Sequence, residues 1–173
     1  MITIKSGGAH MSSSSLSILD AINFAIELEE RGTHFYREAA KRMEDEDQRN
    51  LVLLLMGQTN QHLEDVKKIF SYVELQRGID AAPLDSETAS YIAALGKNIG
   101  FPSEAQAAQK IADCISVSQI LNIAIQGEKD SLSLYKEISE KAFDAEVKKI
   151  FNALKSEEQS HVEQLGEMLA GWA

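Results

Sequence analysis

The sequence has few of the residues that interrupt helices or cross-link a chain. Cysteine occurs once, at Cys114, which excludes an intramolecular disulfide and a Cys-x-x-Cys metal knuckle. Proline occurs twice, at Pro83 and Pro102, so long segments are free of the residue that most strongly breaks helices. No apolar run approaches the roughly 20 residues that a membrane-spanning helix needs. These absences favour a helical protein without disulfides and without a membrane span.

The charge balance disfavours polyanionic partners. The formal net charge is -10 at pH 7, which argues against nucleic acid and against an anionic membrane surface. Residues 1–5 contain no apolar segment long enough for a secretory signal, and we expect a cytoplasmic protein. The 173 residues, 44% of them hydrophobic, suit one domain. Serines and glycines are concentrated near the start, which predicts a mobile N-terminal arm over residues 1–15 and a folded domain over 16–173.

Two stretches of the chain repeat each other at an offset of 99 residues. The segment 23–29, which ends in Glu29, recurs as 122–128, which ends in Glu128, and each is followed seven residues later by a tyrosine. His62 falls on His161 at the same offset, and Asp45 falls on Asp144. Glu158, three residues before His161, falls on Thr59. The repeat therefore predicts two related helical hairpins, with one acidic residue missing from the first.

Apolar residues at three- and four-residue spacing predict four long helices, over about 16–43, 45–76, 117–141 and 144–168. Asp45 or Asp47 can cap the second helix, and Asp144 can cap the fourth. About 38 residues, from Gly78 to Ile115, separate the two hairpins, and 86–95 can form a short helix within them. A connection of this length can cross a bundle about 35 to 45 Å long. We therefore expect an all-α, ferritin-like four-helix bundle with one long crossover over about 78–115.

The repeated polar residues are spaced as metal ligands on helices would be. Residues three or seven apart share a helix face, so Glu158 lies beside His161, and Glu29 and Glu128 each lie on the face of a tyrosine. An unpaired ionised carboxylate inside an apolar seam would cost several kcal/mol, and a bound cation would remove that cost. Each residue alone is common on solvated helix faces. Their recurrence in both halves favours a metal centre, and carboxylates together with imidazoles suit iron, manganese or zinc. The predicted ligands are Glu29, His62, Glu128, Glu158 and His161.

Other polar residues are expected outside this centre. Glu30 and Glu157 should point about 100° away from the predicted ligands, and Gln58 lies at no angle that replaces the missing carboxylate. We expect His34 to be exposed on another face and Cys114 to be a buried, inert thiol. The remaining expectations are that His10 lies in the N-terminal arm and that Tyr91 and Trp172 pack.

These residues resemble the rubrerythrin and ferritin-like di-iron family. Its pattern is a glutamate with a tyrosine seven residues later on the first and third helices, and Glu-x-x-His on the second and fourth. The resemblance covers nearly all of residues 16–168 and implies a carboxylate-bridged two-metal site with oxygen or peroxide chemistry. Tyr36 and Tyr135 would then orient the ligands. The chain departs from the pattern at Thr59 and at Ser131, where typical rubrerythrins carry glutamates, and it has no rubredoxin-like cysteine domain.

Three hypotheses follow from the sequence. The first is a di-iron oxidoreductase that acts on peroxide or oxygen, depends on an external electron donor and forms a homodimer, as the resemblance implies. The second is a metal-binding or regulatory bundle without catalysis, and the third is a structural bundle without metal. Under the first, the ion held by Glu128, Glu158 and His161 should bind more tightly than the ion held by Glu29 and His62.

Overall fold

The chain forms a helical bundle in a computed structural model that describes residues 16–76, 83–97 and 100–171. The predicted N-terminal arm with His10, and also Trp172, lie outside these residues. The described part contains α-helices and no strand. The helices are α1 (Ile18–Ala40), α2 (Glu46–Gln76), α3 (Ser86–Lys97), α4 (Glu104–Ala112), α5 (Val117–Lys141) and α6 (Ala145–Gly171). The predicted all-α fold is confirmed, and none of these helices is long and apolar enough to cross a membrane.

The helix ends follow from side chains that cap them. The Ser17 side chain accepts a hydrogen bond from the backbone N–H of Asp20, whose carboxylate accepts one from the Ser17 N–H, so α1 begins at Ile18. Asp45 accepts the backbone N–H of Gln48 before α2, and Asp144 accepts the N–H of Val147 at the start of α6, as predicted. The predicted end of the first helix at 43 is three residues too late.

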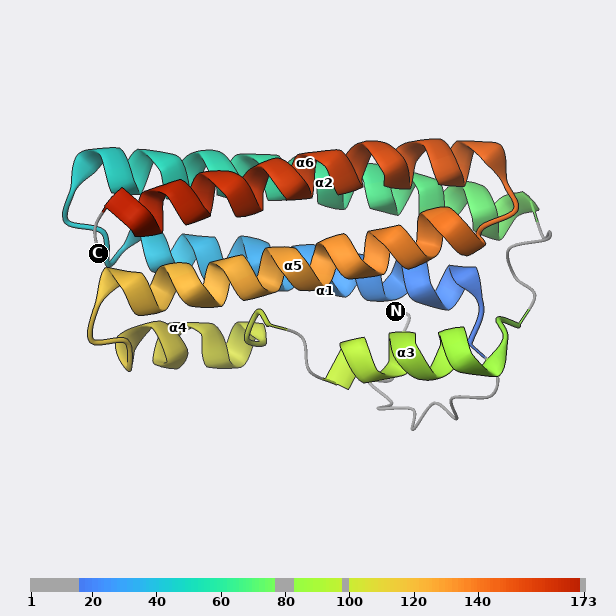
Figure 1. Ribbon diagram of the computed structural model, residues 1–173, viewed down its shortest axis with the longest axis horizontal. Coiled ribbons are helices and arrows are strands. Elements are labelled where there is room, and N and C mark those ends of the chain that lie inside the picture. The colour runs from blue at the N-terminus through green and yellow to red at the C-terminus, as the bar shows by residue number, and fades with distance from the viewer. Residues whose placement is uncertain (1–15, 77–82, 98–99, 172–173) are drawn as a thin grey trace, which may run out of the picture.

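The four long helices form two antiparallel hairpins, α1 with α2 and α5 with α6 (Figure 1). The hairpins pack against each other mainly through α1 and α5, and α2 also contacts α6. Short loops join the helices of each hairpin, whereas the long segment between α2 and α5 runs along the bundle, as the sequence predicted.

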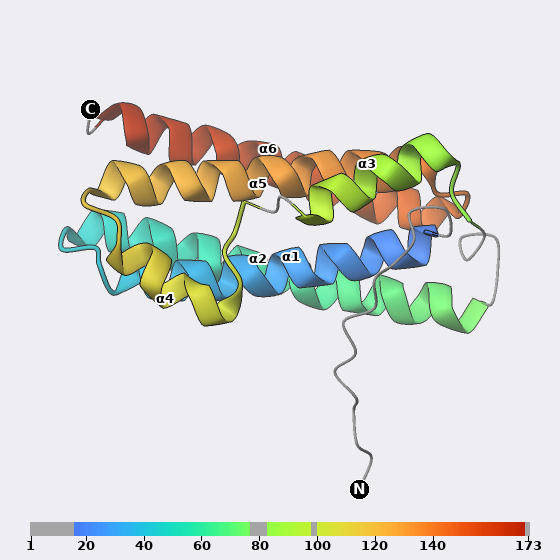
Figure 2. The ribbon, with the colours of Figure 1, turned by 90° about the horizontal axis from the view of Figure 1, so that it is seen from below.

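The crossover contains two helices that lie along one side of the bundle (Figures 1 and 2). α3 packs against α5 and α4 packs against α1. The expectation of a helix at 86–95 is confirmed, but α4 was not predicted, and Tyr91 of α3 is 44% exposed where packing was expected. The loop before α4 inserts Phe101 into the bundle, with its ring centroid 5.4 Å from that of Phe35 and 5.7 Å from that of Tyr36.

Two apolar clusters fill the bundle, one toward each end. The first contains Ile22, Val66, Ile138 and Phe151, and the second contains Phe35, Leu55, Leu121 and Leu165. Every long helix contributes to both clusters, because each carries an apolar stripe along its whole length. Between the two clusters, near the middle of each long helix, lie buried polar and charged side chains.

Candidate metal centre

Five ionisable side chains from four helices lie buried at the middle of the bundle. Glu29 belongs to α1, His62 to α2, Glu128 to α5, and Glu158 and His161 to α6, and none is more than 3% exposed. Ionisable residues are almost never buried to this extent unless they are paired or bind a metal. These are the five residues that the sequence predicted as ligands, and the fold brings them together; their binding of metal stays a prediction.

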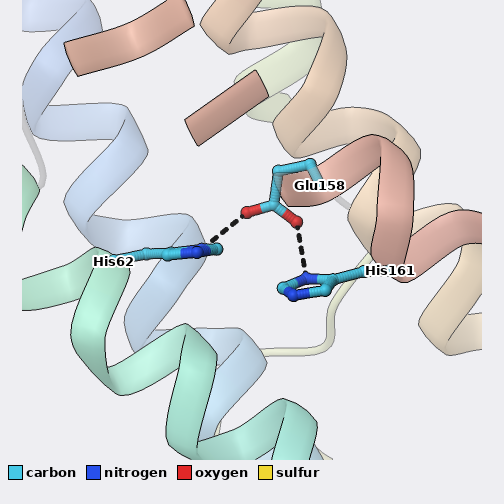
Figure 3. Close-up of side chains that lie close together, drawn as sticks. All are labelled: His62, Glu158 and His161. Atoms are coloured by element: carbon cyan, nitrogen blue, oxygen red, sulfur yellow. Dashed lines mark hydrogen bonds and ion pairs between the residues drawn. The ribbon is translucent and has the colours of Figure 1, made fainter. Parts of the chain in front are cut away.

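Glu158 stands between the two histidines (Figure 3). Its Oε1 lies 2.9 Å from Nδ1 of His62, and its Oε2 lies 3.2 Å from Nδ1 of His161. The two imidazole rings stack, with centroids 5.4 Å apart and planes inclined by 15°. Ligand atoms of all three residues lie within 4.8 Å of one another, a spacing that could hold a metal ion.

Glu29 and Glu128 flank this group, one on each side. Glu29 Oε1 lies 3.8 Å from His62 Nδ1, and Glu128 Oε2 lies 3.7 Å from His161 Nδ1. Each half of the site therefore consists of one glutamate and one histidine, and the halves share Glu158, with one oxygen toward each. Because the two halves have the same number of ligands, ligand number gives no reason for one half to bind an ion more tightly than the other.

The two tyrosines link the halves crosswise. The Tyr36 hydroxyl donates a hydrogen bond to Glu128, and the Tyr135 hydroxyl donates one to Glu29. Each tyrosine thus orients the glutamate of the opposite hairpin and not the one on its own helix. Burial raises the pKa of both phenols well above its usual value, and the nearby carboxylates raise it further, so both hydroxyls stay protonated donors.

Glu157 contacts the site although the sequence reasoning placed it about 100° away. Its Oε2 lies 2.9 Å from Nε2 of His62, and the carboxylate is 56% exposed. The prediction was wrong because helical angle alone ignores the partner helix: His62 reaches from α2 toward α6 and meets the long side chain of Glu157 there. Through this contact, the partly exposed Glu157 connects the buried His62 ring to the protein surface.

The buried carboxyls do not titrate alike. Burial raises the pKa of Glu29 and of Glu158 well above the usual value, and repulsion between neighbouring carboxylates adds to the rise. For Glu128 burial acts in the same direction, but contacts with Glu158 and His161 outweigh it and lower the pKa. Burial disfavours a charged His161, yet the Glu128 and Glu158 carboxylates raise its pKa to about 10. The charge of a protonated His161 thus offsets that of Glu128.

Thr59 and Ser131 are buried at the positions of the two missing glutamates. A Cβ atom placed on Gly32 of α1 would lie 3.2 Å from the methyl carbon of Thr59. The Thr59 side chain therefore fills space against the α1 backbone, and its neutral hydroxyl is a poor metal ligand unless it is deprotonated.

Comparison with known proteins bears on this arrangement of residues. The family model described as Rubrerythrin matches residues 20–169, which include all five buried ionisable residues. The chain belongs to the rubrerythrin family. No curated protein and no solved structure gives a significant match. Membership in the rubrerythrin family agrees with the observed bundle and with a His/Glu cluster at its centre.

The donor set of this rubrerythrin-family chain fits a pair of divalent ions. Three carboxylates and two imidazoles, which suit iron, manganese and zinc, surround one buried point, and the Nδ1 atom of each histidine faces the carboxylate oxygens at 2.9 to 3.8 Å. Tyrosines and Glu157 hold the outer sides of these ligands, as the outer partners of metal ligands commonly do.

His34 and Cys114 both lie outside the cluster of five ionisable side chains. His34 points to another face, as predicted, but it is partly buried, with its side chain 28% exposed and Nε2 3.5 Å from a Glu104 oxygen. Cys114 is buried, as expected, and burial raises the pKa of its thiol, which makes a reactive thiolate unfavourable. It lies between α4 and α5 and not within the third long helix.

Phe101 is the residue near the site that the sequence reasoning missed. Its ring packs against Tyr36, the donor to Glu128, and a Cβ placed on Gly127 would lie 2.4 Å from it. The Gly–Phe–Pro sequence in the crossover gave one signal, an aromatic residue between two turn formers. Its insertion beside Gly127 depends on the tertiary path of the crossover, and the sequence alone carries no sign of it.

Proposed function

We propose that this protein is a di-iron oxidoreductase that reduces peroxide or oxygen with electrons from an external donor. The observation that supports this most is the convergence of three carboxylates and two imidazoles at a point no more than 3% exposed in a rubrerythrin-family bundle. Manganese or zinc would fit the same donors, and the iron assignment rests on the family. A cytoplasmic homodimer is part of the proposal.

Each hairpin supplies ligands to one ion in this proposal. Glu29 and His62 would hold one ion, Glu128 and His161 would hold the other, and Glu158 would be shared, since its two oxygens face the two histidines. A ferrous pair held there would supply two electrons, which together with two protons reduce hydrogen peroxide to two waters, and the external donor would restore the electrons.

The protein side chains orient the ligands and balance charge. Tyr36 and Tyr135 keep Glu128 and Glu29 in place by donating hydrogen bonds across the bundle. Three ionised glutamates leave a net charge of +1 beside two divalent ions. Glu157, in contact with His62, brings a fourth carboxylate to the edge of the site and offsets that charge, although Thr59 stands at the position of the family's fourth buried glutamate.

The second candidate is a metal-binding or regulatory bundle without turnover, and Thr59 is the observation that favours it. A neutral threonine at a bridging position leaves one carboxylate bridge, Glu158, where the family pattern has two. A structural bundle without metal is the third candidate, because the raised pKa values of Glu158 and His161 favour protonated forms, which lower the buried negative charge without a metal.

Metal content and single-turnover oxidation distinguish these candidates. Protein purified without added metal is analysed for iron, manganese and zinc, then loaded anaerobically with ferrous iron and mixed with hydrogen peroxide or oxygen. Two ions per chain and rapid oxidation by peroxide or oxygen support the first candidate. Bound metal without faster oxidation than free ferrous iron supports the second, and no bound metal supports the third.

A further inference from the structure

Two buried polar atoms stand without a hydrogen-bond partner within the described part of the chain. They are Oε1 of Gln58 on α2 and Nε2 of His161 on α6. One is an acceptor and the other carries a proton when Nδ1 serves as the ligand or when the ring is charged. An unsatisfied buried polar atom costs about 1 to 3 kcal/mol, so a pair of opposite hydrogen-bonding character near one site needs an explanation.

The internal repeat relates these two atoms to a pair of side chains that do form a hydrogen bond with each other. The offset of 99 residues that places His62 on His161 also places Gln58 on Glu157. Glu157 on α6 accepts the Nε2 proton of His62 on α2 at 2.9 Å. By the same repeat, the equivalent contact in the other half of the site would join Gln58 on α2 to His161 on α6. The Nδ1 atom of His161 faces Glu158, and the ring extends from α6 toward α2 (Figure 3).

We propose that Gln58 is the positioning residue of His161: its side-chain carbonyl accepts the Nε2 proton of His161 through one water molecule. This inference rests on the proposed function, because its purpose is to keep Nδ1 of His161 turned toward the metal position, as Glu157 does for Nδ1 of His62. A histidine ligand commonly donates its second ring proton to such a partner, which fixes the ring and its tautomer.

The two histidines then have unequal partners. Glu157 is a carboxylate, so its hydrogen bond with His62 involves a charged group, whereas the amide of Gln58 is neutral and orients His161 without adding charge. Residues 58 and 59 are glutamine and threonine where 157 and 158 are both glutamate. The first hairpin thus lacks two carboxylates relative to the second, one that bridges the ions and one that supports a histidine. We expect Gln58 to support the His161 position mainly by orienting the His161 ring and less by any effect on charge.

Four variants of the full chain test this proposal. Gln58→Leu removes the acceptor, and Gln58→Glu keeps it and adds a charge. Gln61→Leu is the matched control, because Gln61 lies on the exposed face of the same helix and its side chain donates a hydrogen bond to Asp65. Glu157→Gln gives His62 an amide partner of the kind proposed for His161. Exchange of the His161 Nε2 proton with water is measured by NMR in metal-free protein, and zinc affinity is measured by competition with a chelator.

In Gln58→Leu we expect exchange of this proton to quicken at least about tenfold and the zinc position served by His161 to lose about tenfold or more in affinity, as for other outer partners of metal ligands. Gln58→Glu restores both, and Gln61→Leu changes neither. Equal behaviour of Gln58→Leu and Gln61→Leu would overturn the proposal. Failure of wild-type protein to bind zinc or iron would refute the proposed function instead, while the proton exchange still decides the role of Gln58.

Discussion

At the scale of single residues, the protein depends on five ionisable side chains that lie inside an apolar bundle. Replacing Glu128 by Gln, or His161 by Gln, removes a predicted ligand while nearly keeping the volume. We expect each change to lower bound metal by about half, since one of two positions loses its ligand. Metal analysis after equilibrium dialysis measures this. His34→Gln is the control, because His34 pairs with Glu104 away from the site; equal losses in all three variants would contradict the ligand assignment.

Thr59 allows a second test at this scale. Thr59→Glu adds a carboxylate at a position only 3% exposed, so we expect a lower melting temperature in metal-free protein, because the new charge or its proton must be buried. Ferrous iron should reverse this loss, bind more tightly than in wild type and react faster with peroxide. Anaerobic iron titration and thermal unfolding measure these effects. Unchanged iron binding in the variant would show that another group already supplies the second bridge.

At the scale of helices, the contact between the crossover and α5 holds the Tyr36 side of the site. A Cβ added at Gly127 would lie 2.4 Å from the Phe101 ring, so Gly127→Ala must displace that ring. We expect destabilisation by about 1 to 3 kcal/mol, as for other overpacked cores, and weaker metal binding, because Tyr36 loses its neighbour. Urea unfolding measures the first effect and metal competition the second.

Gly57 on α2 provides the control for this prediction. A Cβ added there meets no heavy atom within 4 Å, and alanine favours an exposed helix interior over glycine by up to about 1 kcal/mol. Gly57→Ala should therefore leave stability equal or slightly higher. If Gly127→Ala behaves like Gly57→Ala, Phe101 does not hold this side of the site.

At the scale of the whole molecule, metal binding should be coupled to folding and to pH. Nearby carboxylates raise the pKa of His161 to about 10, so His161 carries a proton at neutral pH and must release it to bind an ion; burial raises the pKa of Glu158 as well and acts in the same direction. Each released proton weakens apparent affinity about tenfold per unit of pH decrease. We expect iron or zinc to raise the melting temperature, less at pH 6 than at pH 8. A shift that is larger at pH 6 would mean that these groups do not bind the ion.

The stability of metal-free protein should show the opposite trend with pH. The pKa of His161 lies above its unfolded value near 6.5, so its ion pairs stabilise the fold fully below that value, and the contribution is lost as pH rises through about 10. Thermal unfolding of metal-free protein from pH 6 to pH 10 measures this, with His161→Gln as the comparison. A loss of stability of equal size in both proteins would assign the effect to other groups.

The sequence by itself determined the helices and the residues at the site. Apolar spacing and the absence of proline within them set the four long helices to within a few residues at most ends. The repeat at 99 residues identified Glu29, His62, Glu128 and His161, and the three-residue spacing to His161 added Glu158. These features can be predicted because helical periodicity and ligand spacing depend on residues that are close in the sequence. The duplicated hairpin shows both patterns twice.

Only the tertiary structure decided which side chains meet across helices. The crosswise pairing of Tyr36 with Glu128, the contact of Glu157 with His62 and the insertion of Phe101 beside Gly127 each join residues from different elements. Helical angle specifies a direction from one axis, but a contact depends on where the neighbouring axis lies and how far a long side chain reaches. Such contacts are fixed only when the hairpins pack, and they decide how the site is oriented.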